Sequence, residues 1–453
     1  MSFFKTAIPL LALMCLASCP SQAEVPPATD LNQQLMAAVW GGDAAQVQTL
    51  IAQGANVNKS EEELGRTPLM EAASNAGGQN MTPIVGALLE HGADVDAQDK
   101  NGLTPLMFAM DMASADLLLA KKPHLTLRDD HGRTALLWAI FHEVPALVRA
   151  LLDQGANAND SDKEGQTALS YAAEGKSGTQ MIPLLLAKGV PVDGRDSYGG
   201  TALIYAANAD LSGNIRLLLH AGADVNARDK IGETALLDAA HMSADLPTMR
   251  LLLQAGANID AQNADGETAL KLALRNATGE ESVARFLLQH GANPNLADKD
   301  GDTPMIQAIS AYHAPAFLSF LVAHGARINA QDKAGQTALM VAAGIQDTDS
   351  MARLLALGAD PNTKDKDGAT ALFYAATDKY SVPMMETSSE PGSFNPTTAS
   401  FFSPATLKAV KLLLAHRAKV NVRDKNGRTV LVYAKSEKHS PLVMQLERSG
   451  ERE

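Results

Sequence analysis

Cysteine is almost absent from this chain, and what there is lies at one end. Of the 453 residues only two are cysteines, Cys15 and Cys19, and both fall within the first 23 residues. The rest of the sequence therefore has no thiol for catalysis, for thiolate-bound zinc or for a disulfide. A chain without thiols in its main part is compatible with an oxidising compartment, where it would fold without disulfides.

Positive charge and long apolar runs are also scarce. The net charge is −13, and Lys5 is the only charged residue among the first 23, so the remainder carries 51 acidic against 37 basic residues (38 − 1). Binding to nucleic acid relies on clustered Lys and Arg, so we expect no nucleic-acid partner. No apolar run after the N-terminus reaches the ~18 residues of a membrane-spanning helix, so we expect a soluble body.

The first 23 residues read as a secretory signal: a short positive start, MSFFK, is followed by the apolar stretch TAIPLLALMCLA and small residues. Two cleavage sites remain open. Leu16-Ala17-Ser18-Cys19 resembles a bacterial lipobox, which would remove residues 1–18 and lipidate Cys19. Ser21-Gln22-Ala23 before Glu24 suits ordinary signal peptidase, which would remove residues 1–23. Residues 24–29 then read as a linker, and we expect export to the periplasm or cell envelope of a Gram-negative bacterium, or secretion.

What the sequence has in quantity is a repeat. A Thr-x-Leu element (Met in one case) recurs eleven times at intervals close to 33 residues, except for a last interval of 59; the threonines are Thr67, Thr104, Thr134, Thr167, Thr201, Thr234, Thr268, Thr303, Thr337, Thr370 and Thr429. A glycine element alternates with it, as in GADVN from Gly222 and GADPN from Gly358. Self-similarity at this period indicates a repeat architecture.

The residue types follow from the chemistry of helix ends. Threonine caps a first helix, and proline at its first position loses no hydrogen bond. A leucine and an Ala-Ala pair give that helix a small apolar face, a Leu-rich second helix follows, and glycine ends it in a left-handed conformation. This pattern resembles the ankyrin-repeat family. The resemblance implies an all-α solenoid of about twelve helix-turn-helix units with β-hairpin-like fingers over residues 30–453, with caps at about 30–62 and 429–453.

The finger length is nearly constant. Each repeat glycine position precedes the next threonine by 12 residues, with one case of 13, even where Lys122 or Arg417 replaces the glycine. Length changes are therefore confined to the helix pairs. The pair from Thr104 to Lys122 is the shortest, and we expect Lys122-Pro123 to be a weak joint. The interval of 59 predicts an inserted loop at about 378–404.

Aromatic residues make up only 4% of the chain, yet six of the eleven positions four residues after the repeat threonines are aromatic, four of them in consecutive repeats: Phe108, Trp138, Tyr171 and Tyr205. Two interpretations remain open. These side chains pack between adjacent helices as core, or they line a concave groove that binds a peptide or protein. Tyr198 and Ile231, apolar residues at finger turns, would extend such a groove.

No catalytic or metal motif stands out beside the repeat. EGKSG lacks the first glycine of a phosphate loop, ADKDG and TKDKDG fail the ligand frame of a calcium loop, and several histidines precede repeat glycines, where they favour a helix C-terminus. We therefore expect no enzyme activity, no cofactor and no metal, but a monomeric scaffold that binds a protein or peptide, with membrane contact only through a lipid at Cys19. The alternatives are a secreted effector acting on a host protein and an enzyme whose site is not recognised.

Overall fold

A computed structural model describes residues 30–74, 80–242, 245–275, 281–311, 314–376, 404–436 and 440–450. The chain divides into two compact units, Met1–Asp224 and Val225–Glu453. The predictions for the signal peptide, for Cys19 and for the linker lie outside the described residues. So does the predicted insert, apart from Pro404, which begins a helix.

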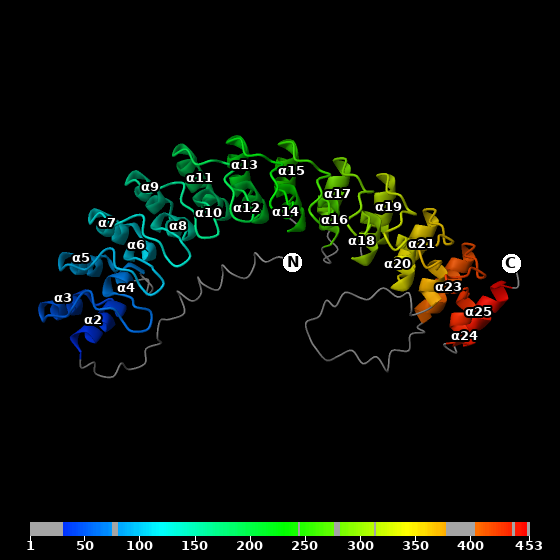
Figure 1. The fold of residues 1–453 in the computed structure, drawn as a ribbon, viewed down its shortest axis with the longest axis horizontal. Helices are drawn as coiled ribbons and strands as arrows, with labels where there is room; N and C mark the ends of the chain where they lie inside the picture. The colour runs from blue at the N-terminus through cyan, green and yellow to red at the C-terminus, as the bar shows by residue number, and fades with distance from the viewer. Residues whose placement is uncertain are drawn as a thin grey trace. The chain divides into compact units, whose positions relative to one another are not determined.

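The described residues form 24 helices in twelve pairs, which confirms the predicted all-α solenoid (Figure 1). The six pairs of the first unit are α2 (Leu31–Trp40) and α3 (Ala44–Ala52), α4 (Pro68–Ser74) and α5 (Thr82–Glu90), α6 (Pro105–Phe108) and α7 (Met112–Ala120), α8 (Ala135–Phe141) and α9 (Pro145–Asp153), α10 (Ala168–Glu174) and α11 (Gly178–Ala187), and α12 (Ala202–Asn208) and α13 (Ser212–His220). Within this unit the first helices of neighbouring pairs contact one another, and so do the second helices.

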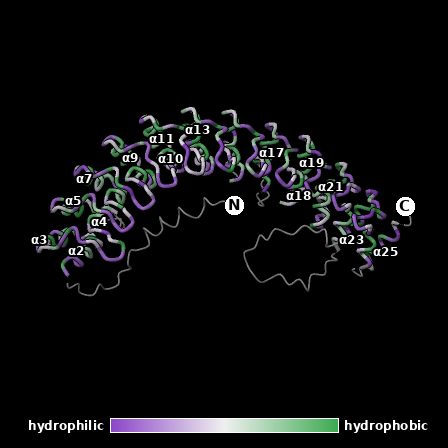
Figure 2. Tube along the Cα trace, in the orientation of Figure 1, coloured by the Kyte–Doolittle hydropathy of each residue, from purple (hydrophilic) through white to green (hydrophobic). Residues whose placement is uncertain are grey.

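The second unit repeats the arrangement. Its pairs are α14 (Ala235–His241) and α15 (Leu246–Gln254), α16 (Ala269–Leu274) and α17 (Ser282–Gln289), α18 (Pro304–Ser310) and α19 (Pro315–Ala323), α20 (Ala338–Gly344) and α21 (Thr348–Ala356), α22 (Ala371–Ala376) and α23 (Pro404–Ala415), and α24 (Val430–Ser436) and α25 (Ser440–Gly450). Figure 2 shows apolar residues concentrated in the helices and hydrophilic residues in the connecting fingers.

The first helix of each pair begins and packs as the sequence predicts. In α12, for example, Oγ1 of Thr201 accepts a hydrogen bond from the backbone N–H of Ile204, and the Ala206-Ala207 pair is completely buried. Alanine side chains allow neighbouring helices to approach closely, because they occupy little volume. The stack is therefore held mainly by burial of Leu, Ile, Met and Ala between successive pairs.

The fingers are turns rather than regular hairpins. Among the described residues they make only isolated antiparallel bridges, at Ser161–Thr167, Gln262–Thr268, Gln331–Thr337 and Arg423–Thr429. Consecutive fingers within a unit are joined by a backbone hydrogen bond, as from the N–H of Lys163 to the carbonyl of His131 (2.8 Å). One inserted residue would shift this donor out of register, which explains the constant finger length.

Close contact between fingers also requires glycine. Gly301 has φ +86°, and a Cβ at this position would lie 2.5 Å from the backbone nitrogen of Lys333 in the next finger. The glycine is needed for its left-handed backbone and for the space that it leaves.

The shortest pair differs from the others in two features. Helix α6 spans only Pro105–Phe108, a single turn, and Lys122 takes over the left-handed position that glycine holds elsewhere, with φ +56°. A left-handed conformation costs about 1–2 kcal/mol in a residue that carries a Cβ. Arg417 does the same with φ +66°. The finger that follows Lys122 therefore keeps its register at a local cost in stability.

Candidate protein-binding surface

An aspartate five residues before the capping threonine shapes most of the fingers; we call this position the finger base. At Asp196, Oδ1 accepts hydrogen bonds from the backbone N–H groups of Tyr198 and Gly200, both at 2.8 Å. The same pair of bonds recurs along the chain; for example, Oδ1 of Asp365 accepts from the backbone N–H groups of Asp367 and Ala369. Asn263 can replace aspartate, because its Oδ1 also accepts from residues two and four positions later.

The second carboxylate oxygen binds the aromatic residue nine positions further on. Nε1 of Trp138 donates to Oδ2 of Asp129 at 3.0 Å, and the tyrosine hydroxyls donate to the equivalent oxygens; the pairs are Tyr171–Asp162, Tyr205–Asp196, Tyr374–Asp365 and Tyr433–Asp424. A hydrogen bond to a charged acceptor is stronger than one between neutral groups. Each of these aromatic residues therefore fixes its finger to the first helix of its own pair.

The structure contradicts the groove interpretation for two of the four consecutive aromatic residues. Phe108 and Trp138 are only 8% and 6% exposed, so their rings belong to the packed interior. Tyr171 and Tyr205 are partly buried and use their hydroxyls on Asp162 and Asp196. Of the two interpretations, packing as core therefore holds for Phe108 and Trp138, because both rings are buried; at Trp138 the indole N–H is also satisfied by Asp129 of the same repeat.

Arginine residues cover several of these rings. The guanidinium of Arg133 lies 4.1 Å from the ring of Trp138, and its Nε donates to Oδ2 of Asp129 at 2.8 Å. The guanidinium of Arg66 lies 4.7 Å from the ring of Phe108. Arginine therefore serves as a second kind of donor at the finger base, where its planar head both stacks on a ring and binds a carboxylate.

Burial and charge alter two kinds of titrating group here. Burial, and next the positive charge of Arg133, lower the pKa of His142 to about 4. His142 stacks on Trp138 with 5.2 Å between the ring centroids. Burial, followed by the neighbouring aspartate, raises the pKa of Tyr171, Tyr205 and Tyr374. These tyrosines therefore remain protonated donors at neutral pH.

The two finger-turn candidates are exposed. In the first unit Tyr198 is 49% exposed, and in the second unit Ile231 is 58% exposed. Each follows its finger-base aspartate by two residues, and its backbone N–H donates to that aspartate. Because the backbone carries this bond, the finger turn does not depend on the side chain at either position.

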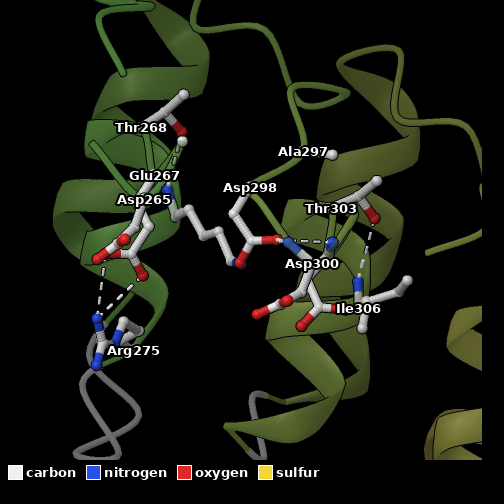
Figure 3. A network of polar contacts seen from close by, with 12 residues as sticks. Asp265, Glu267, Thr268, Arg275, Ala297, Asp298, Asp300, Thr303 and Ile306 are labelled. Atoms are coloured by element: carbon white, nitrogen blue, oxygen red, sulfur yellow. Dashed lines mark hydrogen bonds and ion pairs between the residues drawn. The ribbon is translucent and has the colours of Figure 1, made fainter. Parts of the chain in front are cut away.

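The second unit also contains a charged contact that sequence reasoning missed. Lys271 of α16 is buried, and its Nζ binds Oδ2 of Asp298, the finger base of the next pair. Figure 3 shows Asp298 between the two neighbouring pairs, with Asp300 and Ile306 on its own side. A buried lysine requires such a carboxylate partner. The signal in the sequence was a lysine three residues after Thr268, where other repeats have mostly apolar residues.

The described residues show little else that could carry chemistry. No group of three His, Cys, Asp or Glu side chains in this part of the chain is placed to hold a metal ion. Four histidines before repeat positions instead hydrogen-bond through Nδ1 to the carbonyl four residues earlier; they are His91, His290, His324 and His416. Within the same residues no helix has the length and apolar character to cross a membrane.

Comparison with known proteins identifies relatives for part of the chain. Palmitoyltransferase AKR1 of Lachancea kluyveri is 32% identical over 150 residues, which are 32% of this chain and 20% of the relative. The human 2-5A-dependent ribonuclease is 42% identical over 90 residues (20% and 12%), and the Bos taurus mitochondrial disaggregase is 29% identical over 172 residues (37% and 24%). The chain spans less than a quarter of the length of each of these three relatives.

The match to a family is broader. Ankyrin repeats, described in sets of three copies, match in overlapping segments from residue 35 to residue 385: 35–129, 75–162, 111–179, 142–229, 212–298, 236–332, 290–365 and 307–385. These segments cover more than half of the chain and agree with the helix pairs and fingers of both units. The chain therefore belongs to the ankyrin-repeat family, whose fold generally serves as a non-catalytic scaffold for binding other proteins.

Proposed function

We propose that this protein is a scaffold of the cell envelope that holds or masks another exported protein, and that it contacts this partner through the exposed turns of its fingers. The observation that carries the proposal is the pair of apolar finger turns, Tyr198 in one unit and Ile231 in the other, both exposed. Tyrosine is enriched where proteins bind one another, because its ring gives a large contact area at a low entropic cost.

Equivalent positions in other fingers support a binding role for these two side chains. The residue two after the finger base is polar in most repeats, as at Asn101, His131 and Asn426. Since the fold tolerates polar residues there, an apolar side chain is not required by the finger. A partner protein that covered such a side chain would remove its apolar surface from water, which is favourable.

The test replaces each side chain by the residue that the chain itself uses at the same position. Tyr198→Asn and Ile231→Asn keep the backbone hydrogen bonds to Asp196 and Asp229. Immobilised wild-type protein is expected to retain one defined partner from an envelope extract, and each variant to retain at least ten-fold less at an unchanged melting temperature. Equal capture by the wild type and both variants would contradict the proposed surface.

The envelope location is part of the proposal and rests on residues 1–23. Mass spectrometry of the mature protein distinguishes its two forms: a diacylglyceryl group on Cys19 identifies a lipoprotein, and a free Glu24 identifies a soluble exported protein. Recovery of the mature chain from the culture medium would favour the secreted effector. An intact Met1 in purified protein would contradict export in any form.

A further inference from the structure

One finger base in the second unit differs from its neighbours. Asp298 is bound by Lys271, Asp365 by Tyr374 and Asp424 by Tyr433. At Asp332 the residues that the structure describes supply a donor to Oδ1 only, from the backbone N–H of Gln336 at 2.7 Å. The residue nine positions after Asp332 is Val341, which cannot donate a hydrogen bond.

A cleft lies where the aromatic residue would be. Its volume is about 300 Å³, and its lining includes Asp300, Asp302, Ile306, Asp332, Gln336 and Val341. The next pair of the same unit shows how such a space is otherwise filled. The hydroxyl of Tyr374 binds Asp365 and also interacts with Gln336, the residue before Thr337. Asp302 is the corresponding residue before Thr303, so a tyrosine at position 341 would lie between Asp302 and Asp332.

The chemistry of the lining favours a cation with an apolar stem. Three carboxylates and a single lysine, Lys333, surround the cleft, while Ile306 and Val341 are almost completely buried and form an apolar floor. Burial raises the pKa of Asp302; the positive charge of Lys271 lowers it in part, and the negative charges of Asp298, Asp332 and Asp300 raise it further. A positive group in the cleft would relieve this repulsion.

The chain itself shows which cation suits a finger base. Arg133 binds Oδ2 of Asp129 through its guanidinium while its planar face covers Trp138. A guanidinium presents several donors in one plane and can bind two carboxylates at once, which an ammonium group on lysine does less well. We infer that the cleft beside Val341 binds an arginine side chain of the partner protein, with Asp332 and Asp302 as its carboxylate ligands.

This inference rests on the proposed function only in that the ligand is part of a protein. The probe is a fluorescein-labelled peptide, Gly-Arg-Gly-Ser-Arg-Gly-Ser-Arg-Gly, with citrulline and tyrosine counterparts at the arginine positions. Citrulline has nearly the shape of arginine without the charge. Binding to the full chain is measured by fluorescence anisotropy at low ionic strength, where screening is weak.

Two variants address the cleft, and one matched variant lies outside its lining. Asp332→Asn keeps the finger turn, because Asn263 forms the same turn at its own finger base. Val341→Tyr fills the cleft from within. Asp265→Asn removes the same charge from an exposed finger position of the same unit. Circular dichroism and the melting temperature report whether each variant is folded.

We expect the arginine peptide to bind the wild type at least ten-fold more tightly than the citrulline or the tyrosine peptide. Asp332→Asn and Val341→Tyr each weaken it five- to ten-fold, and Asp265→Asn changes it less than two-fold. Equal binding of arginine and citrulline peptides, tighter binding of the tyrosine peptide, or equal losses in Asp332→Asn and Asp265→Asn would each overturn the inference. If Val341→Tyr does not fold, the Asp332→Asn and Asp265→Asn pair decides.

The partner-capture experiment separates the two proposals. If partner capture depends on Tyr198 or Ile231 but the arginine peptide does not bind, the scaffold proposal stands and the arginine site is refuted. If the peptide binds in a way that depends on Asp332, but the wild type and both finger-turn variants capture the partner equally, the arginine site stands. The proposed finger-turn surface is then refuted.

Discussion

The finger bases at Asp365 and Asp332 lie in the same unit and have the same backbone turn, but only one of them is filled. Tyr374 donates to the second oxygen of Asp365, whereas Val341 leaves the corresponding side of Asp332 open to a cleft. The aromatic residue is thus not what forms the finger, because at both positions Oδ1 accepts a hydrogen bond from the backbone N–H four residues later. It fixes the finger to the helix, and where it is absent another group can take its place, as Lys271 does at Asp298.

Removing the aromatic side chain from a finger base should have the largest effect on stability. Trp138→Ala removes a buried indole and its hydrogen bond to Asp129, and we expect it to lower the free energy of unfolding by about 3–5 kcal/mol. Trp138→Phe keeps most of the ring and leaves Arg133 on Asp129, so about 1 kcal/mol is expected. Urea titration measures both. A loss below about 1 kcal/mol in Trp138→Ala would be expected only of a solvated ring.

The filled base at Trp138 should also respond to pH through His142. Its pKa of about 4 in the folded chain lies below the usual 6.5, so the unfolded chain takes up the proton first. This contribution is complete above pH 6.5 and is lost as the pH falls towards 4, by up to about 3 kcal/mol. The difference in unfolding free energy between wild type and His142→Asn isolates it from the carboxylates. A difference that does not change between pH 7 and 4.5 would refute the burial of a neutral His142.

A third change alters the start of a finger without touching any finger base. Lys122 adopts φ +56°, so Lys122→Gly should raise the free energy of unfolding by about 1 kcal/mol. Lys121, its neighbour in a right-handed conformation with φ −83°, provides the matched control. Lys121→Gly should lower the stability by about 0.5–1 kcal/mol. If both substitutions destabilise the protein to a similar extent, Lys122 is not a strained position in solution.

The sequence predicted the helices and fingers well because threonine caps, glycine ends and Ala-Ala pairs act locally. It also located Lys122 as an exception, because the finger spacing persists without the glycine. The period alone could not show whether the aromatic side chains point into the core or into a groove, because both kinds of position recur once in every repeat. The informative signal was the aspartate nine residues before Trp138 and Tyr171, which indicates a donor that is satisfied within the repeat.

Other features depend on how neighbouring pairs pack. The contact from Lys271 to Asp298 joins residues of different repeats. A local sequence pattern cannot predict which lysine binds which aspartate across repeats. The cleft beside Val341 requires the volumes of two adjacent pairs as well as the absence of a ring. The exposure of Tyr198 and Ile231 was within reach of the sequence, because both stand at a turn position that is polar in most other repeats.

The claim that aromatic residues fix the fingers through their aspartates is tested most directly by a double-mutant cycle at Asp365 and Tyr374. Asp365→Asn retains the backbone bonds of the turn, Tyr374→Phe removes only the hydroxyl, and the unfolding free energies of both single variants and the double variant give the coupling. We expect about 1–2 kcal/mol of coupling here, as for a hydrogen bond to a charged group. The same cycle with Asp332→Asn and Val341→Ile should give a coupling close to zero. Additive effects at Asp365 and Tyr374, within about 0.3 kcal/mol, would contradict the account.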